Sequence, residues 1–242
     1  MTEKTFNKIF SAFILVGTAV SVILATIIKT VRNDADVDSL LVISAFGSVM
    51  GVLSTVSAAN GKIITFLFGF IDVTIYGVMC FLGENYGNAA QHLLYFVPMQ
   101  IIGFYQWRKR GAAAKSEVKA RRLSGKQWVL TLAVFAGGTA ISYLILDRFS
   151  DDPAGNIIKM AILTDAMAMI CNMIGQFLMS TAYAEQWFFW IGVNISSVIM
   201  WSVAAADPSS SGHGFATIYI IKYAFYLLNA LNGLRIWLKL SK

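Results

Sequence analysis

Charged side chains are scarce in this sequence. Asp, Glu, Lys and Arg make up 13% of its 242 residues, whereas hydrophobic residues make up 57%. Soluble domains usually carry about 25% charged residues, and the mean hydropathy of this chain is +0.65. A chain of this composition has too few polar groups for a domain in water, so we expect an integral membrane protein.

Cysteine and histidine are also rare, with two of each. Both cysteines fall inside apolar runs, which excludes a disulfide framework, and the isolated histidines give no metal-ligand cluster. The sequence has no phosphate-binding loop, HExxH or GxSxG motif. An intramembrane enzyme acting on lipid would need a nucleophile with its base, or a metal, and only scattered Ser, His and Asp are present. We therefore expect no enzyme activity, no cofactor and no metal.

Long apolar runs dominate what is present. A helix needs about 20 apolar residues to cross the hydrocarbon core, whereas the strands of a membrane barrel would show short alternating segments. The first run follows Lys4 and Lys8 but is too long for a signal peptide, so we expect a retained helix. The eight runs are about 9–30, 39–59, 62–83, 88–107, 127–147, 157–183, 186–205 and 214–238. They predict an all-α integral membrane fold with eight spans.

Basic residues concentrate between the fourth and fifth runs. Residues 107–128 contain eight Lys and Arg and one acid, Glu117. By the positive-inside rule this segment is cytoplasmic, and counting outward places both termini on the same side. The predicted outer loops carry acids such as Asp34, Asp151 and Asp207. We interpret the segment as a solvated topology signal rather than a lipid-headgroup site, and the net charge of +6 then requires no nucleic acid partner.

Two parts of the chain resemble each other. The segment QIIGFYQWRK (100–109) aligns with ALNGLRIWLK, 130 residues later, and both contain Gly-x-x-x-Trp-x-Lys. At an offset of 124, SVMG matches NMIG, and at an offset of 122 Asp72 matches Asn194. Spans two to four and six to eight then form two three-helix repeats, which the fifth span makes parallel.

This pattern predicts a three-plus-one-plus-three architecture with an extra N-terminal helix. Parallel repeats related by an axis along the membrane normal are typical of transporters, in which substrate binds near the midplane between the repeats. The predicted parts are an accessory helix at 1–38, a first repeat at 39–107, a basic loop with a linker helix at 108–156, and a second repeat at 157–242.

Two opposite charges fall near the middle of predicted spans. Asp72 lies about ten residues into the third span and Lys222 about eight residues into the eighth, which enters from the other side. At about 1.5 Å per residue both lie near mid-membrane, where a charge costs about 2.5–3.5 kcal/mol. Either they form a structural ion pair, or they couple transport to protons or orient a substrate.

Four amide side chains also lie within the spans: Gln100, Asn194, Asn229 and Asn232. Each either bridges two helices or contacts a ligand. Pro98 lacks a backbone donor and leaves a carbonyl that needs polar surroundings. Together these residues indicate a polar, uncharged pocket rich in hydrogen-bonding groups.

The stretch EQWFFWIGVN places Trp187, Trp190 and Asn194 on one helical stripe, because residues three and four apart share a face. Trp187 alone is also typical of an aromatic belt at the membrane surface. Phe68 and Tyr226 add aromatic faces. Such faces with neutral hydrogen-bonding groups suit a ring that carries an amide and hydroxyls, whereas a phosphate would need an Arg cluster that the spans lack.

The motif WFFWIGVN, together with PMQIIGFYQW around Gln100, resembles the PnuC-type vitamin transporters of bacteria, specifically the nicotinamide riboside transporters. The resemblance covers about residues 40–240. It implies a fold similar to that of the SWEET sugar transporters, assembled as a homotrimer in the bacterial inner membrane. It also implies facilitated diffusion of nicotinamide riboside, a vitamin B3 precursor for NAD biosynthesis, which a cytosolic kinase then traps by phosphorylation.

The resemblance carries four substrate-binding residues onto this chain: Gln100, Trp187, Trp190 and Asn194. Depth and repeat position add Phe68, Asp72, Tyr226, Asn229 and Asn232. Nicotinamide riboside is a cation, so indole faces would attract it by about 2 kcal/mol when desolvated, and Asp72 would balance its charge.

One alternative stays open. A proton-coupled symporter of a related vitamin, thiamine or riboflavin, would use Asp72 or Asp165, because carboxyl groups inside spans relay protons in transporters. In both cases the expected partners are a small vitamin and the lipid bilayer.

Overall fold

Helices account for nearly all of the described chain. The structure, a computed structural model, describes residues 2–32, 39–113, 116–148, 156–206 and 213–242, so Asp34, Asp151 and Asp207 lie outside it. The helices are α1 (Glu3–Arg32), α2 (Ser39–Ala59), α3 (Thr65–Leu82), α4 (Tyr86–Ala90), η1 (Gln91–Phe96), α5 (Val97–Lys109), α6 (Gly125–Arg148), α7 (Asn156–Ser180), α8 (Gln186–Ala206) and α9 (His213–Leu240). The predicted all-α class is confirmed.

The fourth predicted span is continuous but irregular. A π-helical segment, η1, separates the short α4 from α5, and Pro98 is the second residue of α5. Proline has no N–H and its ring displaces the carbonyl one turn earlier, and a wider π turn accommodates that displaced carbonyl. Pro98 therefore marks the irregularity that the sequence indicated.

Five of the described helices are long and apolar enough, each by itself, to cross a bilayer. They are α1, α2, α3, α6 and α7. Their outward faces carry large apolar side chains, for example Leu130 and Leu144 on α6, which are both 65% exposed. A face of this kind is stable against lipid rather than water, in agreement with an integral membrane protein.

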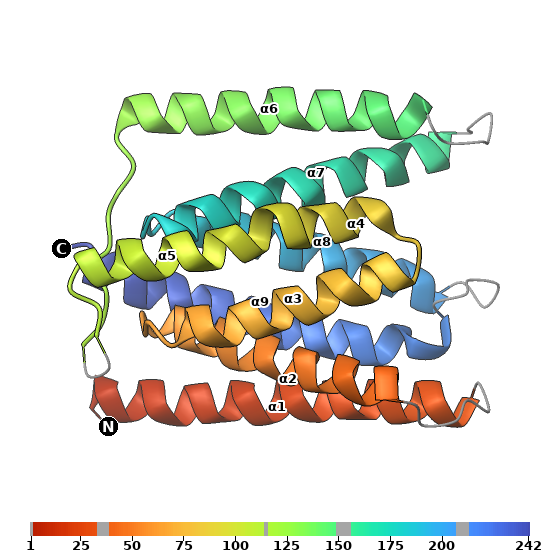
Figure 1. The fold of residues 1–242 in the computed structure, drawn as a ribbon, viewed down its shortest axis with the longest axis horizontal. Coiled ribbons are helices and arrows are strands. Elements are labelled where there is room, and N and C mark those ends of the chain that lie inside the picture. The colour runs from red at the N-terminus through yellow and green to blue at the C-terminus, as the bar shows by residue number, and fades with distance from the viewer. Residues whose placement is uncertain (1, 33–38, 114–115, 149–155, 207–212) are drawn as a thin grey trace.

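Six helices form a closed ring (Figure 1). α2 packs on α3, α3 on α5, α5 on α7, α7 on α8 and α8 on α9, which returns to α2. α1 lies outside the ring along α9 and α2, and α6 lies outside along α7, so these two helices form opposite edges of the molecule. Both termini lie at the same end of the bundle, on the left of Figure 1.

The basic segment crosses this end as an extended strap, defined here as residues 116–124. Its side chains alternate: Val118 and Ala120 are 1% and 8% exposed, whereas Lys119 and Arg121 are exposed. A period of two is that of an extended chain. The prediction of a solvated segment is therefore right for these charged groups and wrong for the apolar residues between them.

Backbone hydrogen bonds attach the strap to two helix ends that belong to different predicted repeats. Val118 N donates to Gly61 O in the turn between α2 and α3, at 3.0 Å. Ala120 N donates to Leu240 O at the end of α9, at 3.1 Å. The strap thereby holds these two ends together.

A third attachment is to the turn between α7 and α8. Arg121 N donates to Ala182 O at 2.7 Å, and Arg121 O accepts from Ala184 N at 2.9 Å. Arg122 Nε also donates to Glu185 Oε1 at 2.7 Å, and the Glu185 side chain is 1% exposed. A carboxylate this deeply buried needs such a cation, so the pair fixes the strap at the start of α8.

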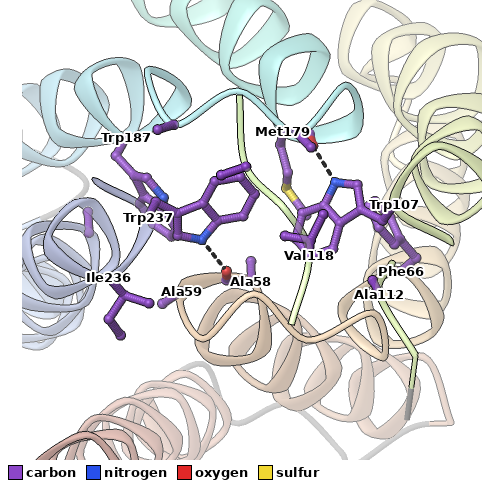
Figure 2. Packing of buried hydrophobic residues seen from close by; sticks show 14 residues of the cluster. Ala58, Ala59, Phe66, Trp107, Ala112, Val118, Met179, Trp187, Ile236 and Trp237 are labelled. Carbon is purple, nitrogen blue, oxygen red and sulfur yellow. Dashed lines mark hydrogen bonds between the residues drawn. The ribbon is translucent and has the colours of Figure 1, made fainter. Parts of the chain in front are cut away.

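Three indoles fill the end of the ring beneath the strap (Figure 2). Trp107 Nε1 donates to Met179 O at 2.7 Å, and Trp237 Nε1 donates to Ala58 O at 2.9 Å. The ring of Trp237 lies 5.1 Å from that of Trp107 and 6.3 Å from that of Trp187. Trp187 is only 2% exposed, so its interpretation as a membrane-surface residue is wrong: its ring is enclosed by protein.

The tucked position of the strap is testable by cross-linking. A Cβ atom at Gly61 would lie 3.5 Å from the Cβ atom of Glu117, within the range of about 3.5–4.5 Å that a disulfide requires. In a background with Cys80 and Cys171 replaced by Ala, we expect Gly61→Cys/Glu117→Cys to form a disulfide on oxidation, measured by mass spectrometry.

The matched control for this cross-link is Gly125→Cys/Glu117→Cys, because no heavy atom lies within 4 Å of a Cβ at Gly125. It should stay reduced. Equal, slow oxidation of the two variants would show that the strap is not packed against the turn between α2 and α3.

Candidate functional site

The four amides predicted to form a pocket are all buried. Gln100, Asn194, Asn229 and Asn232 have exposed fractions of 3%, 8%, 1% and 7%. They lie on α5, α8 and α9, which are members of the ring. Their hydrogen-bond partners, however, divide them into different roles.

Asn229 and Asn232 already have partners. Asn229 Nδ2 donates to Thr55 O on α2 at 3.2 Å, which ties α9 to α2. Asn232 Oδ1 accepts from Arg235 at 3.1 and 2.9 Å, and Arg235 in turn bonds to Asn7 on α1. Asn229 therefore acts as a bridge between helices, and Asn232 is held toward α1, outside the ring.

Gln100 has no such partner for its carbonyl oxygen. Oε1 is buried and accepts no hydrogen bond among the described residues. The side chain lies directly over Gly69 of α3: a Cβ atom there would be 2.6 Å from Oε1. A buried acceptor left alone costs about 1–3 kcal/mol, so Gln100 presents an unused acceptor to a ligand or a water molecule.

The Trp187, Trp190 and Asn194 stripe faces neighbouring helices rather than lipid. A Cβ atom at Gly233 of α9 would lie 2.6 Å from the ring of Trp187, and one at Gly175 of α7 would lie 3.1 Å from the ring of Trp190. Trp187 belongs to the closed end of the ring, and its Nε1 has no partner among the described residues. Trp190 and Asn194 continue the stripe away from that end, and Trp190 is half-buried.

Asp72 and Lys222 come close without pairing. Asp72 packs on Gly51 of α2, where a Cβ atom would be 2.7 Å from Oδ2. Each charge lies in the electrostatic field of the other, but the described residues contain no direct ion pair between them. The Lys222 ammonium lies 5.7 Å from each of three tyrosine rings of its own helix, Tyr219, Tyr223 and Tyr226. The expected structural ion pair is therefore absent from this conformation.

The remaining predicted residues are less buried. Phe68 and Tyr226 are half-buried on α3 and α9, and Tyr226 lies within electrostatic range of Asp72. Asp165, the other carboxyl considered for proton coupling, is exposed on α7. Asp72 is thus the better placed of the two carboxyls to meet a substrate.

The ion pairs of the described residues all lie at the end that carries the termini. The hydrogen bond from Lys239 lowers the pKa of the Glu3 carboxyl below its ordinary value, which keeps Glu3 charged near neutral pH. The four pairs are Lys62–Glu117, Arg122–Glu185, Arg235–Glu3 and Lys239–Glu3. This end therefore has the polar character of a membrane surface, and the candidate amides lie deeper.

A pattern of glycines was missed in the sequence. Four predicted site residues each lie against a glycine of another helix, at contact distances that leave no room for a larger residue. The pairs are Asp72 on Gly51, Gln100 on Gly69, Trp190 on Gly175 and Trp187 on Gly233. The repeat matches had aligned SVMG with NMIG, which end in Gly51 and Gly175, but the sequence gives no sign of which side chain each glycine receives.

A cleft of about 630 Å³ lies elsewhere, between α1, α2, α9 and the strap. Charged residues of both signs line it, including Glu3, Lys8, Lys62 and Lys239. None of the nine predicted site residues does. The candidate site is thus the enclosed group of ring residues around Gln100 and Trp190, and the cleft is a separate feature at the membrane-surface end.

Comparisons with known proteins agree with this architecture. A family model described as "Nicotinamide mononucleotide transporter" matches residues 41–239. A "Nicotinamide riboside transporter PnuC" from Neisseria mucosa is 32% identical, over 83% of this chain and 73% of the relative. Its namesakes from Haemophilus influenzae and Escherichia coli are 29% and 24% identical over the same share of this chain and 80% and 86% of their own lengths.

A solved structure is also similar. The "Crystal structure of the Vitamin B3 transporter PnuC" superposes with a TM-score of 0.68 at 30% identity, and the match covers 100% of this chain and 93% of that one. The resemblance seen around Gln100 and the Trp187 to Asn194 stripe is confirmed. The chain belongs to the PnuC family of membrane transporters.

Proposed function

We propose that this protein transports nicotinamide riboside across the bacterial inner membrane by facilitated diffusion. The observation that carries the proposal is the buried, unpartnered carbonyl oxygen of Gln100, in a ring that also holds Trp190 and Asn194. The carboxamide of nicotinamide supplies an N–H donor for that oxygen, and its flat ring suits an indole face. The names of the relatives support the same substrate.

The riboside is favoured over its mononucleotide, although the family description names the latter. A phosphate must be stripped of water and needs charge-assisted donors in return. The described arginine side chains lie near helix ends or in the strap, and the cation at depth is Lys222 alone. This site suits an uncharged ribose better than a phosphorylated one.

The first test compares the two ligands. We expect the purified protein to bind nicotinamide riboside and to bind the mononucleotide at least tenfold more weakly, measured by titration calorimetry, because the phosphate has no arginine partner. Nicotinamide and thiamine serve as controls for the ribose and for the vitamin class. Equal affinity for riboside and mononucleotide would contradict the proposed selectivity.

A second test separates ligand contacts from helix bridges. Asn194→Leu should weaken riboside binding about tenfold to hundredfold, because a ligand group loses a hydrogen bond worth about 1–3 kcal/mol. Trp190→Leu should weaken binding through the lost aromatic face. Leucine is well tolerated in apolar spans, so both variants should keep their melting temperature.

Asn229→Leu is the matched contrast, because its amide bonds to Thr55 O on α2. It should lower the melting temperature and leave the affinity of the folded fraction nearly unchanged. If Asn194→Leu and Trp190→Leu behave like Asn229→Leu, the stripe is structural and the site must lie around Gln100 and Asp72.

The proposed arrangement is three plus one plus three parallel helices after an accessory helix, with α6 as the linker. Equivalent contacts support it: the N–H donors of Trp107 and Trp237, 130 residues apart, reach Met179 and Ala58, 121 residues apart. Gly103 likewise packs on Phe66 as Gly233 packs on Trp187, again with offsets of 130 and 121. The sequence matches had suggested 130, 124 and 122.

We place both termini and the strap in the cytoplasm. The exposed Lys and Arg of the strap and the ion pairs at this end support that orientation. The homotrimer is expected from the family resemblance alone. Its test is the mass of the purified protein in detergent.

Facilitated diffusion explains why a kinase is needed. A carrier without an energy source only equalises concentrations, so phosphorylation inside the cell must remove the riboside to sustain uptake. The strap and the three indoles close the cytoplasmic end of the ring in this conformation. Release into the cell therefore requires the strap to separate from one of its attachments.

Uptake into vesicles tests this account against proton symport through Asp72. We expect riboside uptake to be indifferent to an imposed pH gradient. We also expect the Gly61→Cys/Glu117→Cys disulfide to stop uptake while leaving binding intact, with recovery on reduction. Uptake that accelerates with an inward proton gradient would favour the symporter, and uptake unaffected by the disulfide would show that the strap does not need to move.

A further inference from the structure

Gly69 contributes space, not backbone flexibility. It lies within helix α3 and is buried, and glycine in a helix interior is about 0.5–1 kcal/mol less favourable than alanine. A Cβ atom at this position would lie 2.6 Å from Oε1 and 3.0 Å from Cδ of Gln100, and 2.9 Å from Oγ of Ser54. The missing methyl group is therefore the volume that the Gln100 amide occupies.

The surface on which this amide lies is fixed by its own hydrogen bonds. Ser54 Oγ donates to Thr65 O at 2.9 Å, and Thr65 Oγ1 donates to Ser54 O at 2.9 Å. These reciprocal bonds join α2 to α3 one turn from Gly69. Because the Ser54 hydroxyl proton is already used, it is not available to the carbonyl oxygen of Gln100, and that acceptor remains free for a ligand.

We propose that Gly69 is a positioning residue for substrate selectivity, which holds the Gln100 amide against α3 so that its carbonyl oxygen meets a carboxamide N–H or a ribose hydroxyl of the substrate. This rests on the proposed function, because Gln100 acts there as a substrate contact. A larger residue at position 69 rotates the amide away from α3. The clash is with the far end of a flexible side chain, so the fold absorbs it and the binding geometry does not.

A double-mutant cycle tests the proposal. The variants are Gly69→Ala, Gln100→Ala and the two combined, with riboside affinity measured by calorimetry and stability by thermal unfolding. We expect each single change to weaken binding about tenfold, the effect of one lost hydrogen bond of about 1.4 kcal/mol. The combined variant should bind no more weakly than Gln100→Ala, because without the glutamine the added methyl group has nothing to displace.

Gly137→Ala is the control, since it lies in α6 and a Cβ there would meet no heavy atom within 4 Å. It should leave affinity unchanged. Additive losses in the combined variant would overturn the proposal, because Gly69 would then act independently of Gln100. Unchanged affinity in Gln100→Ala would overturn it too while leaving the proposed function standing, whereas failure of the parent protein to bind riboside would remove the proposed function itself.

A folding defect in Gly69→Ala would not leave the question open. The combined variant, which lacks the displaced side chain, is then compared with Gln100→Ala alone. Equal melting temperatures and affinities support the proposal, because the methyl group is harmful only when glutamine is present. A lower melting temperature in the combined variant would show that Gly69 is needed for helix packing itself, and would overturn it.

Discussion

An amide buried in an apolar bundle needs a partner, and this constraint organises the molecule. Leaving such a group unpaired costs about 1–3 kcal/mol, so the partners reveal what each amide does. Asn229 is paired with the backbone of α2 and joins two helices. Gln100 keeps a buried acceptor unused, which is acceptable in a transporter because the substrate supplies the missing donor. The candidate site is thus the place where the protein's own hydrogen bonding is incomplete.

The same reasoning explains the closed end. Indole N–H groups would be costly inside the bundle, and two of the three find a carbonyl at the end of a helix across the ring: Trp107 reaches Met179 and Trp237 reaches Ala58 (Figure 2). Because each bond joins helices of different predicted repeats, the pair holds the two halves together. The strap adds backbone bonds to the same ends. Transport requires this well-bonded end to open, which makes it the part of the molecule where rate and stability oppose each other.

Much of the fold was predictable because it depends on local composition. Apolar runs of span length predicted the helices, and Pro98 indicated the irregular fourth span, although the π turn ahead of it depends on packing with α3. The buried residues of the strap were missed because eight basic residues obscure the alternation around Val118. Their pattern becomes meaningful only when the helix ends beneath are known.

The site was predictable in its residues but not in their orientation. Depth placed Asn232 correctly along α9, yet Arg235 draws its amide toward α1. The glycines beneath Gln100 and Trp190 were visible in the sequence, but a glycine states only that something approaches closely. Which side chain fills the space depends on the neighbour that the ring brings to it, and that neighbour is 31 residues away for Gly69 and 15 for Gly175.

A structure determined with bound nicotinamide riboside tests the central claim most directly. The account predicts the nicotinamide ring against Trp190, with its carboxamide nitrogen about 3 Å from Oε1 of Gln100, the ordinary length of such a hydrogen bond. Density for the ligand in the cleft between α1, α2 and α9, where Asn7 and Lys8 lie, with the ring interior filled by side chains alone, would contradict it.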